Sequence, residues 1–542
     1  MQRLAFIELT AKGTLMQTEA AVASTTRSTQ GSGRAFGILF GLILLAGGAY
    51  AGLHLVDDLS IVRSHSTTPF VLLGVALLIA LGFEFVNGFH DTANAVATVI
   101  YTHSMPANLA VIWSGIFNFL GVMNSSGAVA FTVVSLLPVE LILQVGSGAG
   151  FAMVFALLFA AILWNLGTWY FGLPNSSSHT LIGSIIGVGL ANQLTAMKSG
   201  TSGVDWNAAL GVLRGLVFSP IAGFLLAGLL MLLLKVLIKI PALYHAPAGR
   251  KPPPWPIRLL LVLTCTGVSF SHGSNDGQKG MGLIMLILIG TVPTAYALNG
   301  AVSGSQVKTF HEVSVEAQHV LSTIDHGAQV NGNPRDLVTA ALQQRKLLPD
   351  TAPALAALMA QIDQQVGNRS SLRAVPQEQM GNVRNDIYLA NSAIPLVLSQ
   401  PGLSSEQTST LTTWRGLGVK ATQFIPAWVK VAVALALGLG TMVGWKRIVV
   451  TVGERIGKEH LTYAQGASAE LVAMGLIQAA DMYHLPVSTT HVLTSGVAGT
   501  MAANGSGLQW STVRNLLMAW VLTLPASIVL AGGLFIALKH LF

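Results

Sequence analysis

Two short motifs place an aspartate close to a glycine inside long apolar stretches of the chain. The first, Asn87-Gly88-Phe89-His90-Asp91, lies in the run 69–101, and the second, His272-Gly273-Ser274-Asn275-Asp276, lies in 257–298. An ionised side chain at the centre of a membrane span costs about 2.5–3.5 kcal/mol, so such residues usually serve a function. Glycine lets the backbone unwind or approach another helix closely, and unwound backbone offers groups that bind ions. We therefore predict that Asp91 and Asp276, together with Asn94, bind a coupling cation.

Two turns rich in hydroxyl groups complement these motifs. Each turn, Pro174-Asn175-Ser176-Ser177-Ser178-His179 and Pro486-Val487-Ser488-Thr489-Thr490-His491, follows one apolar segment and precedes another. This pattern predicts the tip of a re-entrant hairpin, whose second helix would point its N-terminus at an oxyanion. The predicted substrate-binding residues are Ser176, Ser177, Ser178, Ser488, Thr489 and Thr490, with Asn275 and Gln278. The competing interpretation of each turn is ordinary helix N-capping.

Four histidines and one lysine flank these motifs, and we predict that they support the site. His179 and His491 could relay protons, since histidine titrates near pH ~6.5, but hydrogen bonding that fixes the hairpins is the favoured role. His90 and His272 flank the two aspartates at different motif positions. Lys279 would tune Asp276 or contact the anion. No residue is assigned to catalysis or to a resident metal.

The order and spacing of the motifs indicate an internal duplication. Asp91 and Pro174 are 83 residues apart, and Asp276 and Pro486 are 210 apart; removing the polar stretch 299–423, of 125 residues, leaves 85. Internal repeats, in which the same motifs recur in the same order, are common in secondary transporters. The alternative role for either aspartate is a helix cap or a structural hydrogen bond. The aspartate recurs at equivalent positions of the two halves, and this recurrence favours ion binding.

Positive charge predicts that the two halves are inverted. The N-terminus and the linker 241–256 are basic, and so is the loop with Lys446, Arg447, Arg455 and Lys458. Basic loops lie on the cytoplasmic side. The segment 69–101 would then run inward and 257–290 outward.

Composition places the chain in the membrane. It has 542 residues, of which 52% are hydrophobic and 9% charged, whereas soluble domains carry roughly 25% charged residues. We predict an all-α polytopic membrane protein with inverted repeats, broken helices, two re-entrant hairpins and about 10–12 membrane segments. The net charge of +7 reflects basic loops, so no nucleic acid is expected as a partner. The single cysteine, Cys265, excludes a disulfide within the chain.

The predicted domain organisation has five parts. These are a tail and first membrane helix (1–68), a first repeat (69–240), a basic linker (241–256), a second repeat (257–298 with 424–542) and a soluble, mostly helical insert (299–423). Ala49-Tyr50-Ala51 resembles a signal-peptidase site, but the preceding polar stretch is long for a signal peptide, which favours a retained helix.

At the motifs the sequence resembles the PiT family of inorganic phosphate transporters. The resemblance is carried by residues 87–95, by Gly273 to Gly280 and by both turns, and covers about 69–298 and 424–541. Residues Trp164 to Tyr170 and Gly438 to Thr441 are similar to the bacterial low-affinity Pit branch. The family's Gly-x-Asn-Asp pattern is intact at 273–276 but reads Gly-Phe-His-Asp at 88–91, so no asparagine ligand is carried over to His90.

The resemblance implies a secondary active transporter in the bacterial inner membrane. It would import inorganic phosphate by symport with H⁺, and Mg²⁺ or Zn²⁺ would be carried as a neutral metal–phosphate complex. Membrane lipid is the expected surrounding, and a homodimer is left open. The alternatives are a sulfate or other oxyanion permease and a Na⁺-coupled phosphate symporter. A gated channel is a further rival, and an intramembrane hydrolase is disfavoured because the sequence lacks a nucleophile elbow and a His-Glu-x-x-His motif.

Overall fold

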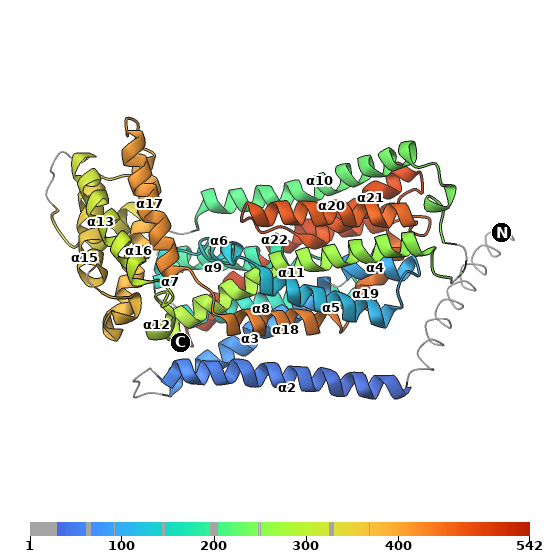
Figure 1. The fold of residues 1–542 in the computed structure, drawn as a ribbon, viewed down its shortest axis with the longest axis horizontal. Helices are drawn as coiled ribbons and strands as arrows, with labels where there is room; N and C mark the ends of the chain where they lie inside the picture. Colours follow the sequence, from blue (N-terminus) through green and yellow to red (C-terminus); the bar gives the residue numbers. More distant parts are fainter. Residues whose placement is uncertain are drawn as a thin grey trace. The chain divides into compact units, whose positions relative to one another are not determined.

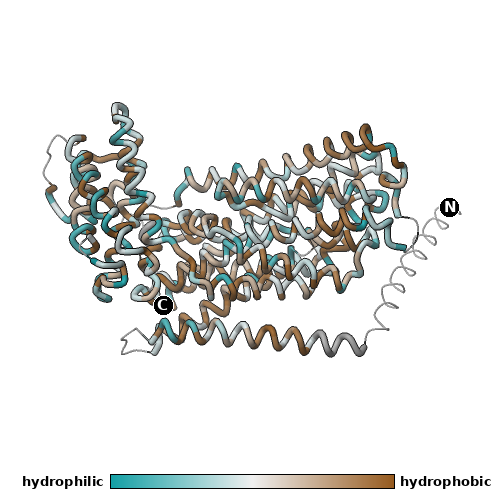
Figure 2. The backbone as a smooth tube through the Cα atoms, viewed as in Figure 1, coloured by the Kyte–Doolittle hydropathy of each residue, from teal (hydrophilic) through white to brown (hydrophobic). Residues whose placement is uncertain are grey.

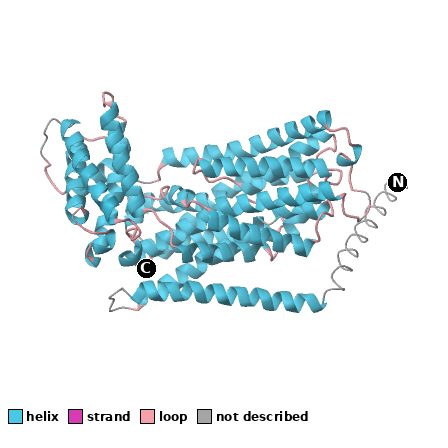
Figure 3. Ribbon diagram, in the orientation of Figure 1, coloured by secondary structure: helices cyan, strands magenta, loops and turns pink. Residues whose placement is uncertain are grey.

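The computed structural model is helical throughout the part of the chain that it describes (Figure 3). That part comprises residues 30–60, 67–91, 93–143, 147–195, 204–247, 249, 251–324, 330–367 and 369–541. Within these ranges the only β-pairing is one isolated bridge between Gly457 and Leu508. The predicted all-α class is confirmed. Most of the predicted N-terminal tail lies outside the described residues.

The helix bounds follow the apolar pattern of the sequence. The membrane part contains α3 (Thr68–Asp91), α4 (Ala93–Tyr101), α5 (Ala107–Asn124), α6 (Ala128–Val134), α7 (Val139–Leu143), α8 (Gly148–Tyr170), α9 (Ser177–Thr195), α10 (Trp206–Leu237), α11 (Trp255–Thr291), α12 (Pro293–Tyr296), α18 (Ala427–Thr441), α19 (Lys446–Val450), α20 (Tyr463–Met482), α21 (Thr489–Asn504) and α22 (Trp510–Lys539). Preceding these, α2 (Gln30–Ser60) runs without a break across Ala49-Tyr50-Ala51.

Within the described residues, six helical segments are long and apolar enough to cross a bilayer. They are Gly37–Ser60, Thr68–Tyr101, Ala107–Asn124, Gly148–Tyr170, Trp206–Leu237 and Trp510–Lys539, and a bent pair, Ser405–Thr422 with Ala427–Thr441, would make a seventh. Figure 2 shows these segments as mostly hydrophobic. This count is lower than the predicted number, and α9, α11 and α21, which carry residues of the polar motifs, are not among these segments. The chain is a multi-pass membrane protein.

Backbone contact between α5 and α11 explains the glycines of the second motif. A Cβ on Gly273 would lie 2.1 Å from the carbonyl oxygen of Asn118, and one on Gly121 would lie 2.1 Å from that of Phe270. Small residues allow such close packing between membrane helices. Because α11 continues through the motif, the expectation of unwound backbone there is wrong. In the first half α3 ends at Asp91 and α4 begins at Ala93.

The two hydroxyl-rich turns each join a pair of helices. One turn lies between α8 and α9, and the other between α20 and α21. The second helix of each pair packs against a long helix of the other half: α9 against α22, and α21 against α10. Figure 1 shows α10, α20 and α21 running side by side. This crosswise packing brings the two turns together in the interior.

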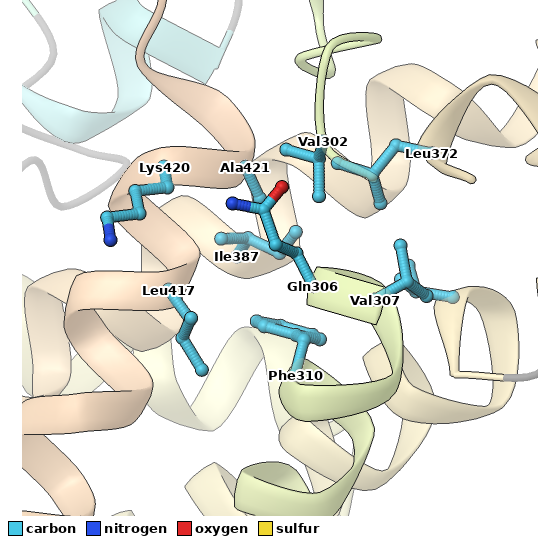
Figure 4. A pocket seen from close by; sticks show the side chains of 10 residues that line it. Val302, Gln306, Val307, Phe310, Leu372, Ile387, Leu417, Lys420 and Ala421 are labelled. Carbon is cyan, nitrogen blue, oxygen red and sulfur yellow. The ribbon is translucent and has the colours of Figure 1, made fainter. Parts of the chain in front are cut away.

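The polar stretch 299–423 folds around a core of its own. It contains α13 (Gly304–Ile324), α14 (Pro334–Gln344), α15 (Thr351–Val366), α16 (Gln377–Leu398) and α17 (Ser405–Thr422). Their buried apolar side chains include Leu355, Ile387 and Trp414. An apolar pocket beside Phe310 and Leu417 has a volume of about 20 Å³ (Figure 4). This is room for about one water molecule, so no ligand is assigned to it.

We expect the insert to be dispensable for transport. Its two ends meet, because the Asn299 N–H donates to the Ala421 carbonyl (2.8 Å) and the Asn299 side chain donates to that of Lys420 (3.0 Å). A short Gly/Ser linker in place of residues 301–418 would therefore close the gap without strain. The phosphate uptake that the family resemblance implies should persist in vesicles. Complete loss of uptake by a normally inserted variant would contradict this expectation.

Candidate functional site

The two turns touch each other deep in the protein. The Ser178 hydroxyl donates to the Val487 carbonyl (2.7 Å), and the ring centroids of His179 and His491 lie 4.6 Å apart. The six predicted hydroxyl residues are each at most 2% exposed. Residues more than 300 positions apart thus form one interior surface.

The second motif meets the first turn through a buried lysine. Lys279 Nζ donates to Asp276 Oδ1 (2.6 Å), to Ser178 Oγ (2.5 Å) and to the Val487 carbonyl (3.3 Å). Its side chain is 1% exposed. Lys279 therefore balances the charge of Asp276 and joins α11 to both turns.

The first motif meets the second turn in the reciprocal way. The Thr490 hydroxyl donates to Asp91 Oδ1, and Asn94 Nδ2 donates to Thr490 Oγ1 at 3.0 Å. Asn94 Oδ1 is buried and has no hydrogen-bond partner among the described residues. His90 lies beside Asp91, with its Nδ1 3.5 Å from Asp91 Oδ1 and its Nε2 3.2 Å from the Thr168 hydroxyl.

His272 joins the two aspartates. Its Nε2 lies 3.6 Å from Asp91 Oδ2 and 3.5 Å from Asp276 Oδ2. Its Nδ1 lies 2.7 Å from Asn118 Oδ1, an acceptor, so Nδ1 carries a hydrogen; in the neutral ring Nε2 then presents a lone pair. Three electron-rich atoms therefore face one point, where a cation would be bound.

The three atoms lie close enough together to be ligands of one cation. Carboxylate oxygens suit both Zn²⁺ and Mg²⁺, and an imidazole nitrogen is a ligand typical of Zn²⁺. Asp91, His272 and Asp276 together could hold a metal ion, a grouping that the sequence did not reveal.

The six hydroxyl residues fall into three pairs: two cap helices, two donate to other protein groups, and two have hydroxyl hydrogens without an acceptor among the described residues. Ser176 and Ser488 cap α9 and α21 by accepting from the His179 and His491 N–H groups, and Ser178 and Thr490 donate within the protein. Ser177 accepts from Asn165 Nδ2 (3.3 Å), which leaves its hydrogen free, and Thr489 Oγ1 has no partner among the described residues. Capping, the competing interpretation, thus applies to Ser176 and Ser488.

Asn275 and Gln278 hold the framework of the site. Asn275 donates to the Leu485 carbonyl (3.2 Å) and accepts from the Val487 N–H (3.4 Å). Gln278 donates to Asp481 Oδ1 (2.7 Å) and accepts from the Val129 N–H (3.0 Å). Their polar groups are engaged with the protein, so direct contact with an anion would require these bonds to break.

His179 and His491 also line an apolar cavity. This cavity, of about 600 Å³, lies between α10, α21 and α22 and reaches His179 and His491. His491 also stacks on Trp520, with 4.2 Å between ring centroids, and His179 Nδ1 lies 2.8 Å from the Ser176 hydroxyl. These contacts support the favoured positional role of both rings.

The sequence analysis missed two buried carboxyl groups near the site. Glu84 on α3 and Glu470 on α20 are both 0% exposed. Thr264 donates to Glu470 Oε2, and the other oxygen of Glu470 has no partner within the described residues. A charged residue within an apolar run was the available signal, but neither residue belongs to a repeated motif.

Comparison with known proteins agrees with this architecture. The pattern of the phosphate transporter family matches residues 87–531. The low-affinity inorganic phosphate transporter PitA of Escherichia coli (strain K12) is 43% identical over 482 residues, spanning 86% of this chain and 96% of that protein. PitB of the same strain is 41% identical over 496 residues, with the same coverage.

More distant similarity extends to other bacteria. The probable low-affinity inorganic phosphate transporter of Bacillus subtilis (strain 168) is 29% identical over 476 residues, spanning 87% of this chain and 99% of that protein. A solved structure titled "The sodium-dependent phosphate transporter" is 18% identical, with a TM-score of 0.48, and covers 87% of this chain and 100% of that one.

Proposed function

The chain belongs to the phosphate transporter family, and we propose that it imports inorganic phosphate across the bacterial inner membrane by symport with protons. Its relatives are named as transporters, and it is a transporter and not an enzyme. The observation that carries the proposal is the meeting of both aspartates, Lys279 and both turns in one buried site. The alternating motion would be that of inverted repeats around this site.

Phosphate would bind between the two turns. Helices α9 and α21 begin there, at Ser177 and Thr489, and first-turn N–H groups have no partner within their own helix. These two residues hold equivalent motif positions and have hydroxyl hydrogens available for phosphate oxygens. Lys279 supplies the nearby positive charge. A site with few fixed positive charges suits an anion that must be released after transport.

The coupling cation would offset repulsion between phosphate and the aspartates. Asp91 and Asp276 each point one oxygen at His272 Nε2, so an anion bound nearby faces two negative groups. A cation at this point removes the repulsion, and the two ligands therefore assist each other's binding. Asn94 Oδ1 would be a further oxygen ligand.

A divalent metal could enter at the same point as part of the cargo. Asp91, His272 and Asp276 would supply three ligands, and a phosphate oxygen would supply a fourth. The metal would then carry phosphate as a neutral complex. The imidazole nitrogen among the ligands favours Zn²⁺ over Mg²⁺ as this cargo.

Uptake by proteoliposomes under separately imposed gradients tests the proposal. We expect an inward pH gradient to drive phosphate accumulation, a sodium gradient to have no effect, and excess sulfate not to compete. A chelator should lower uptake if the metal complex is the main cargo. Accumulation driven only by sodium, or inhibition by sulfate as strong as by phosphate, would overturn the assignment.

A further inference from the structure

Glu84 is a buried carboxyl group that the site described above does not use. It is 0% exposed and lies on α3, seven residues before Asp91. Its Oε1 has no hydrogen-bond partner among the described residues, and its Oε2 accepts only a long bond from Asn87 Nδ2 (3.5 Å). The ion pairs found within the described ranges do not include it.

Helix α11 provides the space that Glu84 occupies. A Cβ on Gly280 would lie 2.3 Å from Glu84 Cγ and Oε1, so only glycine leaves room for the carboxyl group there. The charged groups that face Glu84 are Asp276, Lys279 and His272, all on α11. Lys279 is already bonded to Asp276. The other helices packed against α3, which are α4, α8, α9 and α18, contribute no charged group that acts on Glu84 in the described structure.

This environment stabilises the neutral carboxyl group. An unpaired carboxylate in a protein interior loses several kcal/mol of hydration, and such a group binds a proton instead. A phosphate arriving beside Lys279 adds negative charge near Glu84 and strengthens its hold on that proton. By reciprocity, the proton on Glu84 strengthens phosphate binding.

We propose that Glu84 binds a coupling proton of this transporter through Oε1, in addition to the cation that Asp91, His272 and Asp276 would bind. The inference rests on the proposed function, proton-coupled phosphate import. In the predicted topology α3 runs inward, so Glu84 lies on the outer side of Asp91, about 10 Å along the helix. The carboxylate takes a proton from external water and becomes a carboxylic acid. After phosphate has left to the inside, the proton passes to water there and the carboxylate is restored.

The variant Glu84→Gln separates proton coupling from phosphate binding. Glutamine keeps the shape and the Asn87 contact but cannot bind and release a proton. We expect exchange of labelled phosphate across proteoliposomes to continue, whereas pH-driven accumulation falls by about tenfold or more, within the usual range of coupling between two ligands. Glu84→Asp, which retains a carboxyl group, should keep part of the accumulation. Glu312→Gln is the control, because Glu312 is exposed on α13.

The outcomes distinguish this inference from the proposed function. If the wild-type protein shows no pH-driven accumulation, both the proposed proton coupling and the proposed role of Glu84 are wrong. Normal pH-driven accumulation by both wild type and Glu84→Gln overturns only the role of Glu84. If Glu84→Gln does not fold, infrared spectroscopy of the wild type and Glu84→Asp decides: a protonated-carboxyl band that phosphate strengthens and that shifts in Glu84→Asp supports the proposal, and a band that is absent or unchanged in Glu84→Asp overturns it.

Discussion

Asp91→Asn will strongly reduce pH-driven phosphate accumulation while leaving phosphate exchange measurable. Asparagine still presents an oxygen to the Thr490 hydroxyl. Its amide nitrogen would replace Asp91 Oδ2, which lies 3.6 Å from His272 Nε2, and would carry no negative charge. Phosphate would then meet less repulsion, and its binding would depend less on a cation. We expect the ratio of internal to external phosphate to fall by about tenfold or more, since a loss of about 1.4 kcal/mol in coupling suffices.

Proteoliposomes with an imposed pH gradient provide the measurement. Asp205→Asn is the matched control, because Asp205 caps α10 outside the site and asparagine is an equally good cap. Labelled-phosphate exchange, measured without a gradient, reports that the protein is folded and binds substrate. Asp91→Asn protein that concentrates phosphate as well as wild type, with the same dependence on pH, would show that Asp91 has no part in coupling.

Repetition within the sequence explains why the main parts of the site were predictable. The two aspartates and the two turns occur at equivalent positions of the two halves. The sequence therefore predicted that they serve one site before their contacts were known. Glu84 has no such counterpart: the equivalent residue in the second half, seven before Asp276, is Ser269. A search for repeated motifs therefore passes over Glu84, although a glutamate in an apolar run is itself informative.

Contacts between helices explain what the sequence could not show. His272 points its Nε2 at both aspartates because Asn118, on α5, accepts from its other nitrogen. That pairing depends on α5 and α11 touching at Gly121 and Gly273, which are 152 residues apart. Glycine was correctly associated with the motif, but local sequence does not decide between unwinding and close packing, because the neighbouring helix determines which occurs.

Lys279→Met will destabilise the protein more than a double variant that also removes the charge of Asp276. Lys279 and Asp276 are each 1% exposed, and Lys279 Nζ lies 2.6 Å from Asp276 Oδ1. Removing one partner of a buried ion pair costs about 3–5 kcal/mol, because the other charge stays buried and unpaired. In the double variant Lys279→Met with Asp276→Asn no such charge remains, so most of the stability should return. Thermal unfolding of the detergent-solubilised proteins measures both effects.

We expect the double variant Lys279→Met with Asp276→Asn to regain stability but not transport. The double variant lacks the lysine that bonds Ser178 beside the predicted phosphate position, and it lacks one of the two carboxylates that face His272. We therefore expect a folded protein with little phosphate exchange and no accumulation. Lys308→Met is the control, because Lys308 is 79% exposed on α13. If Lys279→Met alone were as stable as wild type, the buried pair would not be ionised, and the charge balance assigned to Lys279 would be incorrect.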